Sequence, residues 1–389
     1  MRILSSFQQE AIEKLRKLKV GALFMGCGTG KTQTASILIN SVPDVDLLLW
    51  ICPFQTKTNL QEEIEQCGLR YRPVIIGVES IGQSDRIYLE TRELVRQAKR
   101  CFMVVDESLK IKNIGAKRTQ RLLEISRFAE YKLILNGTPI TKNICDVYAQ
   151  MAFLSYKILN MSYYQFCENY CCYSKVKRYG RTVKFVLTGY ANVDHLVSII
   201  KPYVYQCDLD LSLKKRYVDR YWLPTPEEYD VYNALKEQFL KAAENLDNDF
   251  HVLGMLQKMQ HSYCCAEDKM RVLRELVTPK TIIYCKFIKS AEWVKSHFPG
   301  ALVLTYGKNS FGLNLQSYNR IVYFDKTFDY AFREQSEARI YRTGQQDDCE
   351  YFDMSGDLGL EDMIDRCISN KLSLVDYFKK QGRKALEEL

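Results

Sequence analysis

The chain of 389 residues contains no run of eighteen uncharged apolar residues, and its N-terminus shows no signal-peptide pattern. The first absence argues against a membrane-spanning helix, and the second argues against secretion. There is also no Cys-x-x-Cys pair among its 14 cysteines, and cysteines outside the secretory route are typically reduced thiols. We therefore expect a cytoplasmic protein with no membrane partner, long enough for two or three domains.

Cysteine and histidine residues cluster at two places in the sequence. One interpretation is a zinc site that joins both clusters. The spacings match no common zinc pattern, however, which favours a role as small buried hydrophobic side chains. The first cluster is Cys167, Cys171 and Cys172, and the second is His261, Cys264 and Cys265.

A glycine-rich turn follows the first apolar run. Val20 to Met25 is typical of a buried strand, and Gln33 to Asn40 is typical of a helix. Between a strand and a helix, backbone N–H groups and the helix N-terminus can form a phosphate-binding loop. The usual pattern has a glycine where this chain has Met25. The simpler alternative is a turn with a surface lysine. We expect a nucleotide loop made of Gly28, Thr29, Gly30, Lys31 and Thr32, with Lys31 on the β- and γ-phosphates and Thr32 on Mg²⁺.

Two carboxylates end another apolar run, which starts at Cys101. Asp106 and Glu107 follow it directly, and carboxylates at the end of a buried strand are costly unless a cation or a ligand uses them. In a nucleotide enzyme, Asp106 would help to hold Mg²⁺, and Glu107 would orient or deprotonate the attacking water. The alternative role for Asp106 is a helix N-cap.

A helix is expected near the N-terminus, with Ser5 or Ser6 as its cap. Gln8 lies close to its start, and a side-chain amide can both donate to and accept from adenine. A glutamine on a solvated helix face is the more ordinary explanation.

Strands that alternate with helices predict parallel sheets, and hence an α/β fold. Apolar runs place strands in two separate parts of the chain, and the part between them is rich in tyrosine, lysine and helical periodicity. We expect an N-terminal lobe at 1–155, a mostly helical insertion at 156–261 and a C-terminal lobe at 262–389.

The net charge of +8 permits a polyanionic partner without requiring one. The basic segment 175–181 is either a contact for backbone phosphates or a solvated hairpin.

Taken in order, these blocks resemble those of superfamily-two helicases, and more narrowly of the Swi/Snf remodeller-type DNA-dependent ATPases. The similarity runs over nearly the whole chain, and the spacing in its last block is the most specific to the subfamily. The blocks are Gln8, Gly28 to Thr32, Ile51 to Pro53, Asp106 to Asn113, Leu135 to Ile140, Lys201 to Tyr203, Pro224 to Tyr229, Gly312 to Gln316, and Gln335-x-x-x-Arg339-x-x-Arg342-x-Gly344-Gln345.

The resemblance implies two RecA-like lobes with Mg-ATP in the cleft between them. It assigns Gln8 to adenine and Gln335 to the nucleotide site, and it brings Arg339 and Arg342 from the second lobe to the transferred phosphoryl group. We expect these two arginines, three residues apart, to share one helix face. The partner implied is DNA, most simply a duplex held by its phosphates and tracked by a monomer, with a protein partner supplying specificity.

Three departures from the family pattern stand out. Leu109 replaces a histidine, and Gln206 and Cys207 stand where arginines usually occur. The stretch between Phe287 and Gly312 is also about thirty residues shorter than the family pattern. Either the second lobe is smaller, with its remaining strands paired directly, or a segment is missing.

Two further functions stay open at this point. One is a helicase that separates the strands of DNA or RNA. The other is a module that binds nucleic acid under the control of ATP without hydrolysing it, which Leu109 and the short second lobe would suit.

Overall fold

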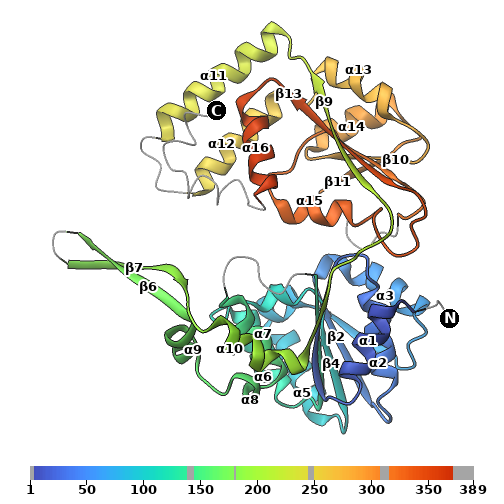
Figure 1. The fold of residues 1–389 in the computed structure, drawn as a ribbon, viewed down its shortest axis with the longest axis vertical. Helices are drawn as coiled ribbons and strands as arrows, with labels where there is room; N and C mark the ends of the chain where they lie inside the picture. The colour runs from blue at the N-terminus through green and yellow to red at the C-terminus, as the bar shows by residue number, and fades with distance from the viewer. Residues whose placement is uncertain (1–3, 138–143, 179–180, 244–248, 307–314, 371–389) are drawn as a thin grey trace. The chain divides into compact units, whose positions relative to one another are not determined.

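The computed structural model describes residues 4–137, 144–178, 181–243, 249–306 and 315–370. The chain divides into two compact units, residues 1–209 and residues 210–389 (Figure 1). Each unit contains its own parallel sheet, so the expected α/β class with two sheet-containing lobes is confirmed.

A six-stranded parallel sheet in the order β3-β2-β4-β5-β1-β8 forms the centre of the first unit. Every side chain of β2 and β4 is buried, as expected for strands covered by helices on both faces. The strands are β1 Val20–Met25, β2 Leu47–Cys52, β3 Pro73–Gly77, β4 Cys101–Val105, β5 Tyr131–Asn136 and β8 Val204–Cys207.

Helices cover both faces of this sheet. Successive side chains of a strand point to opposite faces, so Leu23 and Met25 of β1 belong to one core cluster and Ala22 and Phe24 to another. The first cluster includes α1 Ser6–Leu15, α2 Lys31–Asn40 and α3 Lys57–Gln66. The second includes α4 Val78–Gln83, α5 Asp85–Gln97, α6 Lys117–Ser126, α7 Asp146–Leu154, α8 Tyr156–Leu159, α9 Tyr163–Tyr170 and α10 Val193–Ile200. Three short 3₁₀ helices complete the unit, η1 Phe54–Thr56, η2 Ser108–Ile111 and η3 Lys201–Tyr203.

A two-stranded antiparallel hairpin extends from the helical side of the first unit (Figure 1). Its strands are β6 Cys171–Arg178 and β7 Arg181–Tyr190. The strands pair from Cys171 with Tyr190 to Arg178 with Arg181. The basic segment identified in the sequence therefore belongs to a hairpin.

The second unit contains a five-stranded parallel sheet in the order β11-β10-β12-β13-β9. Each strand pairs directly with its neighbours in the sheet. The described strands thus pair directly, and residues 307–314 of the short stretch lie outside the described residues. The strands are β9 Lys215–Trp222, β10 Thr281–Cys285, β11 Leu302–Thr305, β12 Arg320–Tyr323 and β13 Cys349–Gly356.

The helices of the second unit pack mainly into one core cluster around Trp222, Ile283 and Phe352. On the strands, Tyr284 and Tyr323 alternate with these core residues, and both rings contact Tyr306. The helices are α11 Pro226–Ala243, α12 Asp249–Ser262, α13 Glu267–Leu276, α14 Ile288–His297, α15 Tyr330–Glu337 and α16 Gly359–Ser369.

The segment expected to be a mostly helical insertion contains more strand than its composition suggested. It carries the hairpin, it adds β8 to the edge of the first sheet, and it adds β9 to the edge of the second. Most side chains of β9 are exposed. Because an edge strand of this kind has no apolar run, its sequence gives no buried-strand signal.

Candidate nucleotide site

The glycine-rich loop lies between β1 and α2, in the expected strand–turn–helix arrangement. Gly28 and Gly30 have φ angles of 81° and 77°, which L side chains rarely adopt. A Cβ on Gly30 would also come within 2.5 Å of Gln8 Nε2. Glycine is therefore favoured at Gly30 by its backbone conformation, and a larger residue would also displace the Gln8 amide.

Lys31 begins α2, and its side chain folds back over the loop. Its Nζ donates to the carbonyl oxygens of Met25 at 2.9 Å and Gly26 at 3.2 Å. Thr29 Oγ1 donates to Gly26 O at 2.7 Å, which closes the turn. The ammonium group therefore lies inside the curl of the loop, which excludes the alternative of a surface lysine.

Gln8 is 2% exposed and connects α1 to the loop. Its Nε2 donates to Thr29 O at 3.1 Å and to Gly30 O at 3.4 Å, and its Oε1 accepts from the backbone N–H of Ser5 at 3.0 Å. These contacts exclude the interpretation of a solvated glutamine. They also give Gln8 a role that the sequence did not indicate, as a support for the backbone of the loop.

Asp106 and Glu107 follow β4 as expected. The backbone N–H of Asp106 donates to Ile51 O at 2.7 Å, and Asp106 Oδ1 accepts from the N–H of Glu107 at 2.9 Å. Glu107 has a φ of 50° and is the residue that precedes η2, so Asp106 is not the cap of that helix. A non-glycine residue in this conformation is strained, and such strain is concentrated at functional sites.

The pKa of Asp106 is raised to about 7, first by burial and then by the neighbouring Glu107, while the positive charge of Lys31 lowers it. A carboxylate that is costly to ionise and lies in the field of a lysine is typical of a site that receives a cation. Thr32, at the start of α2, is 7% exposed. The loop N–H groups, the lysine, the threonine hydroxyl and this carboxylate are the donor set that a Mg-nucleotide requires, so the residues fit ATP and Mg²⁺.

Residues on α7 support this carboxylate block, and no pattern in the sequence pointed to them. Ser108 Oγ donates to Gln150 Oε1 at 2.6 Å, and Gln150 Nε2 donates to Asp146 O at 2.8 Å. Asp146 also forms an ion pair with Lys112 at 3.6 Å. Because α7 is an almost fully buried helix, Gln150 and Asp146 could not be distinguished from core residues without their partners.

The residues of the last sequence block lie in the second unit, and one expectation about them is wrong. Gln335 is in α15, but that helix ends at Glu337, so Arg339 and Arg342 lie in the turns that follow rather than on one helix face. Tertiary contacts draw the chain away from the helical path: Tyr341 Oη donates to Leu211 O at 3.1 Å, and Gln345 Nε2 donates to Tyr318 O at 2.7 Å.

Arg339 carries a buried donor. Among the described residues, its Nε has no hydrogen-bond partner. Its charge acts on Tyr284 of β10, where it opposes the rise in the phenol pKa that burial causes. An unsatisfied buried guanidinium N–H is costly, and an anionic ligand would satisfy it.

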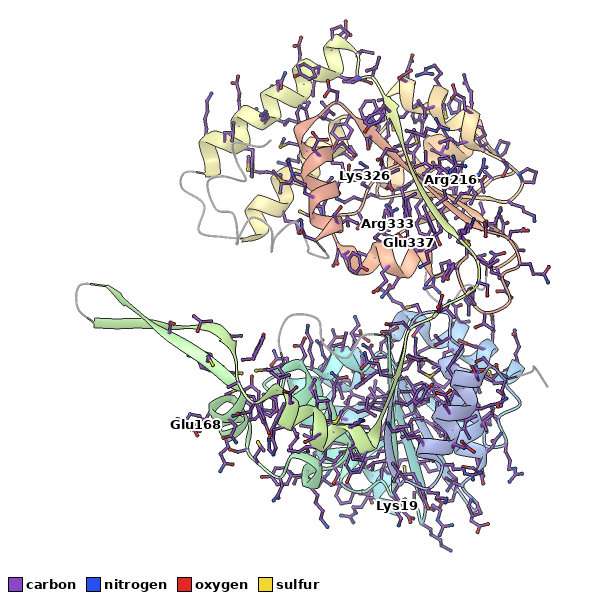
Figure 2. The ribbon with its side chains drawn as sticks, viewed as in Figure 1. Lys19, Glu168, Arg216, Lys326, Arg333 and Glu337 are labelled. Atoms are coloured by element: carbon purple, nitrogen blue, oxygen red, sulfur yellow. The ribbon has the colours of Figure 1, made fainter. Side chains whose placement is uncertain are left out.

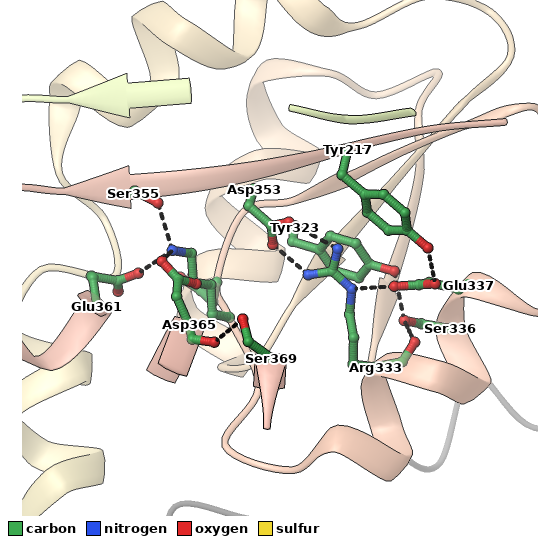
Figure 3. Close-up of polar contacts among 12 residues, drawn as sticks. Tyr217, Tyr323, Arg333, Ser336, Glu337, Asp353, Ser355, Glu361, Asp365 and Ser369 are labelled. Carbon is green, nitrogen blue, oxygen red and sulfur yellow. Dashed lines mark hydrogen bonds and ion pairs between the residues drawn. The ribbon is translucent and has the colours of Figure 1, made fainter. Parts of the chain in front are cut away.

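Helix α15 is fastened to the sheet by a second arginine that the sequence analysis did not single out (Figure 3). Arg333 pairs with Asp353 of β13 and donates to Glu337 Oε1 at 2.8 Å, and its guanidinium lies 3.7 Å from the centre of the Tyr323 ring. Tyr217 Oη of β9 also donates to Glu337, at 2.8 Å. The end of α15, from which the chain continues to Arg339 and Arg342, is thus held by residues of β9, β12 and β13.

Buried Lys326 organises a neighbouring polar group, whose members Ser355, Glu361 and Asp365 are labelled in Figure 3. Its Nζ donates to Ser355 Oγ at 2.5 Å and to Asp365 at 2.6 Å, and it lies 3.5 Å from Glu361. Burial alone would lower the pKa of Lys326, but Glu361 and Asp365 more than offset it, so the pKa is raised. This group holds α16 against β13.

Some of the sequence blocks lie outside the described residues. These are the end of the Leu135 to Ile140 block and the start of the Gly312 to Gln316 block. Within the described ranges, no helix has the length and apolar character needed to span a bilayer.

The predicted cysteine clusters are arranged differently from expectation. Cys172 is exposed and does not join Cys167 and Cys171, which instead meet Cys145. In the second unit, Cys264 and Cys265 contact each other at 3.8 Å, and the ring of His261 contacts that of Phe287. Among the described residues, Cys145, Cys167 and Cys171 are the group of metal-ligating side chains that converges.

Comparison with known proteins agrees with the blocks in the sequence. The SNF2-related domain matches residues 46–282, more than half of the chain. Helicase SWR1 of Cryptococcus neoformans is 34% identical over 71 residues, which are 18% of this chain and 6% of that protein. The chromatin structure-remodeling complex subunit snf21 of Schizosaccharomyces pombe is 29% identical over 165 residues, 36% of this chain and 13% of that protein. The chain thus spans only a small part of the length of these relatives.

Among solved structures, the SWI2/SNF2 ATPase core of Sulfolobus solfataricus in complex with dsDNA aligns with 100% of this chain and 95% of that chain, at 18% identity and a TM-score of 0.45. A second structure of the Sulfolobus solfataricus SWI2/SNF2 ATPase core domain aligns with 100% of this chain and 95% of that chain, at 19% identity and again with a TM-score of 0.45. The family assignment itself rests on the domain match over residues 46–282. The chain belongs to the SNF2-related domain family.

Proposed function

We propose that this chain hydrolyses ATP and that double-stranded DNA stimulates the reaction. The observation that carries the proposal is that Lys31 folds into a loop of left-handed glycines and its charge acts on the half-buried carboxyl group of Asp106. Membership of the SNF2-related family supports it, as do relatives named as helicases and as chromatin-remodeling subunits.

In this proposal, bound Mg-ATP supplies the reactive phosphoryl group, and the side chains divide the work around it. The N–H groups of Gly28 to Thr32 and the ammonium of Lys31 bind phosphate oxygens. Thr32 and Asp106 hold the metal, and Glu107 orients the attacking water. Gln8 supports the loop and lies where a contact to adenine is expected.

The second unit would supply further positive charge at the transferred group. Arg339 and Arg342 lie in the turns that follow α15 in the chain. The unsatisfied Nε of Arg339 suits an anionic partner. We infer that Gln335, on the same helix, also faces the nucleotide. In this scheme, DNA favours the arrangement in which both units act on one nucleotide, because it binds that arrangement more tightly.

The test is an ATPase assay on the full chain with linear duplex, single-stranded DNA and forked DNA. Lys31→Ala should weaken ATP binding, while Glu107→Gln should bind ATP and lose turnover. Lys19→Ala is the matched control, because this lysine directly precedes β1, the strand that leads into the Lys31 loop. The Lys19 side chain is 64% exposed and pairs with Glu130. Lys19 is labelled in Figure 2.

Activation by duplex supports the proposal. Activation only by forked or single-stranded nucleic acid would favour a strand-separating helicase. No turnover under any condition would favour an ATP-gated binding module. Wild-type turnover by Glu107→Gln in the presence of DNA would refute the assignment of the catalytic carboxylate.

A further inference from the structure

Three cysteine sulfurs converge at the base of the hairpin. The Sγ atoms of Cys145, Cys167 and Cys171 all lie within 4.8 Å of one another, and those of Cys145 and Cys171 are 3.4 Å apart. The residues come from three elements: the turn before α7, helix α9 and the first position of β6. None of them is in a disulfide.

Hydrophobic packing alone does not explain this convergence. Cys52, Cys101 and Cys285 show how the chain uses cysteine as a small apolar side chain, because each lies on a different strand and is almost fully buried there. Packing of that kind places one sulfur among carbon atoms. Cys167 and Cys171 lie one helical turn apart, since Cys171 caps α9. Apolar packing gives no reason for Cys145, from another part of the chain, to bring a third sulfur to them.

The separations suit a cation with thiolate ligands. A Zn–S bond of about 2.3 Å places two sulfurs of a tetrahedral site about 3.8 Å apart. Shifts of about an ångström would bring the three sulfurs to that spacing. Among the described residues no fourth His, Cys, Asp or Glu joins the group, so the fourth position would be left to water.

Two phenols surround the sulfurs. Tyr163 interacts with the thiols of Cys145 and Cys167, and Tyr173 interacts with those of Cys167 and Cys171. Phenol O–H groups can donate to thiolate ligands, as the outer partners of metal ligands do. A divalent cation holds such thiols as thiolates.

We propose that Cys145, Cys167 and Cys171 bind Zn²⁺ and that the bound ion fastens the base of the β6–β7 hairpin to helix α7. Each protonated thiol releases its proton on binding, so the ion is held by three thiolates. The inference goes beyond ATP hydrolysis. It also has a structural consequence, because α7 contacts the carboxylate block through Gln150 and Asp146. The ion would connect the hairpin to that block.

The experiment measures zinc directly on the full chain, purified with a thiol reductant and without chelator. We expect about one equivalent of zinc, and we expect Co²⁺ exchanged into the protein to give a sulfur-to-cobalt charge-transfer band. Cys167→Ser should lower zinc affinity by more than about a hundredfold. Cys172→Ser is the matched control, because this exposed neighbour of Cys171 should leave zinc affinity unchanged.

A second measurement uses the wild-type chain, so it does not require any variant to fold. Zinc removal from the wild-type chain should increase hydrogen exchange at the start of β6, and zinc addition should reverse the change. Lys31→Ala should bind zinc normally, so failure of the ATPase proposal leaves this one intact. The inference is overturned if the wild-type chain binds no zinc and shows no cobalt band, or if the Cys145, Cys167 and Cys171 triple serine variant keeps both.

Discussion

The carboxylate of Asp353 receives two hydrogen bonds from the guanidinium of Arg333, one of them at 2.8 Å. Both side chains are largely buried, with exposed fractions of 8% for Arg333 and 12% for Asp353. The pair joins β13 to the helix that precedes Arg339 and Arg342. A buried ion pair of this kind determines where a helix lies, even when its net contribution to stability is small.

Removal of one partner of this pair should be strongly destabilising. Arg333→Ala leaves Asp353 buried without its cation, which costs about 3–5 kcal/mol, and we expect that loss in the calorimetric unfolding transition of the second unit. The exposed pair of Arg86 and Glu90 provides the control, and Arg86→Ala should leave unfolding unchanged within error. A change below about 1 kcal/mol in Arg333→Ala would contradict the role of the pair.

Loss of the Gln8 amide should weaken nucleotide binding through the loop. Gln8→Ala leaves the carbonyls of Thr29 and Gly30 without a donor that they have in the folded chain, and we expect the Kd for ATP to rise by about tenfold. Titration with ATP and GTP provides the measurement. Gln9→Ala is the control, because Gln9 is exposed and its amide donates to Leu4 O, away from the loop. Equal affinities in wild type and Gln8→Ala would exclude both the supporting and the adenine-binding roles.

The raised pKa of Asp106 predicts a pH dependence of stability. The folded-state pKa of about 7 lies above the ordinary value of 3.8, so the folded chain holds a proton that the unfolded chain releases. The contribution of this group to stability is therefore fully present below about pH 4 and is lost as the pH rises to about 7, by up to about 1.4 kcal/mol per pH unit.

Asp106→Asn should remove this dependence, and the difference in unfolding free energy between wild type and variant should change over that range of pH. Because Mg²⁺ binds the ionised carboxylate, the affinity for Mg-nucleotide should rise as the pH passes about 7 in the wild type and should stay flat in the variant. A wild-type profile that is parallel to that of the variant would show that Asp106 is ionised throughout.

The arginines of the second unit should be needed for turnover but not for ATP binding. A transition-state arginine contributes about 10³-fold or more in rate, so Arg339→Ala or Arg342→Ala should abolish DNA-stimulated hydrolysis. Affinity for ATP should stay nearly unchanged. Arg216→Ala is the control, since the Arg216 side chain, labelled in Figure 2, is 71% exposed and pairs with Glu350. A double variant of Arg339 and Arg342 that still responds to DNA would refute this role.

Contacts to backbone phosphates predict a steep loss of DNA affinity with salt. The logarithm of the binding constant should fall linearly with the logarithm of the salt concentration and should vary little with sequence. Charge reversal at Lys175, Lys177 and Arg178 tests the hairpin as one contact surface and should reduce the slope. Unchanged DNA affinity would make that segment a solvated hairpin only, and strong sequence preference at fixed salt would argue against phosphate contacts.

Local signals in the sequence determined much of this protein. The buried run Val20–Met25 has the same bounds in the structure as in the sequence analysis. A strand covered on both faces is apolar along its whole length, so it can be predicted from its own residues. The loop around Lys31 and the carboxylates after β4 were also readable, because strand–turn–helix spacing is a local property.

Partners far away in the sequence decided the rest. Strand β13 went unrecognised because Asp353 and Ser355 interrupt its apolar pattern, and they are tolerated there only because Arg333 and Lys326 bind them. Helix α15 ends before Arg339 because Tyr341 and Gln345 are held by distant backbone groups. In the same way, Cys145 meets Cys167 and Cys171 only once the helices have packed. Contacts of this kind carry no local periodicity, so only the tertiary structure could decide them.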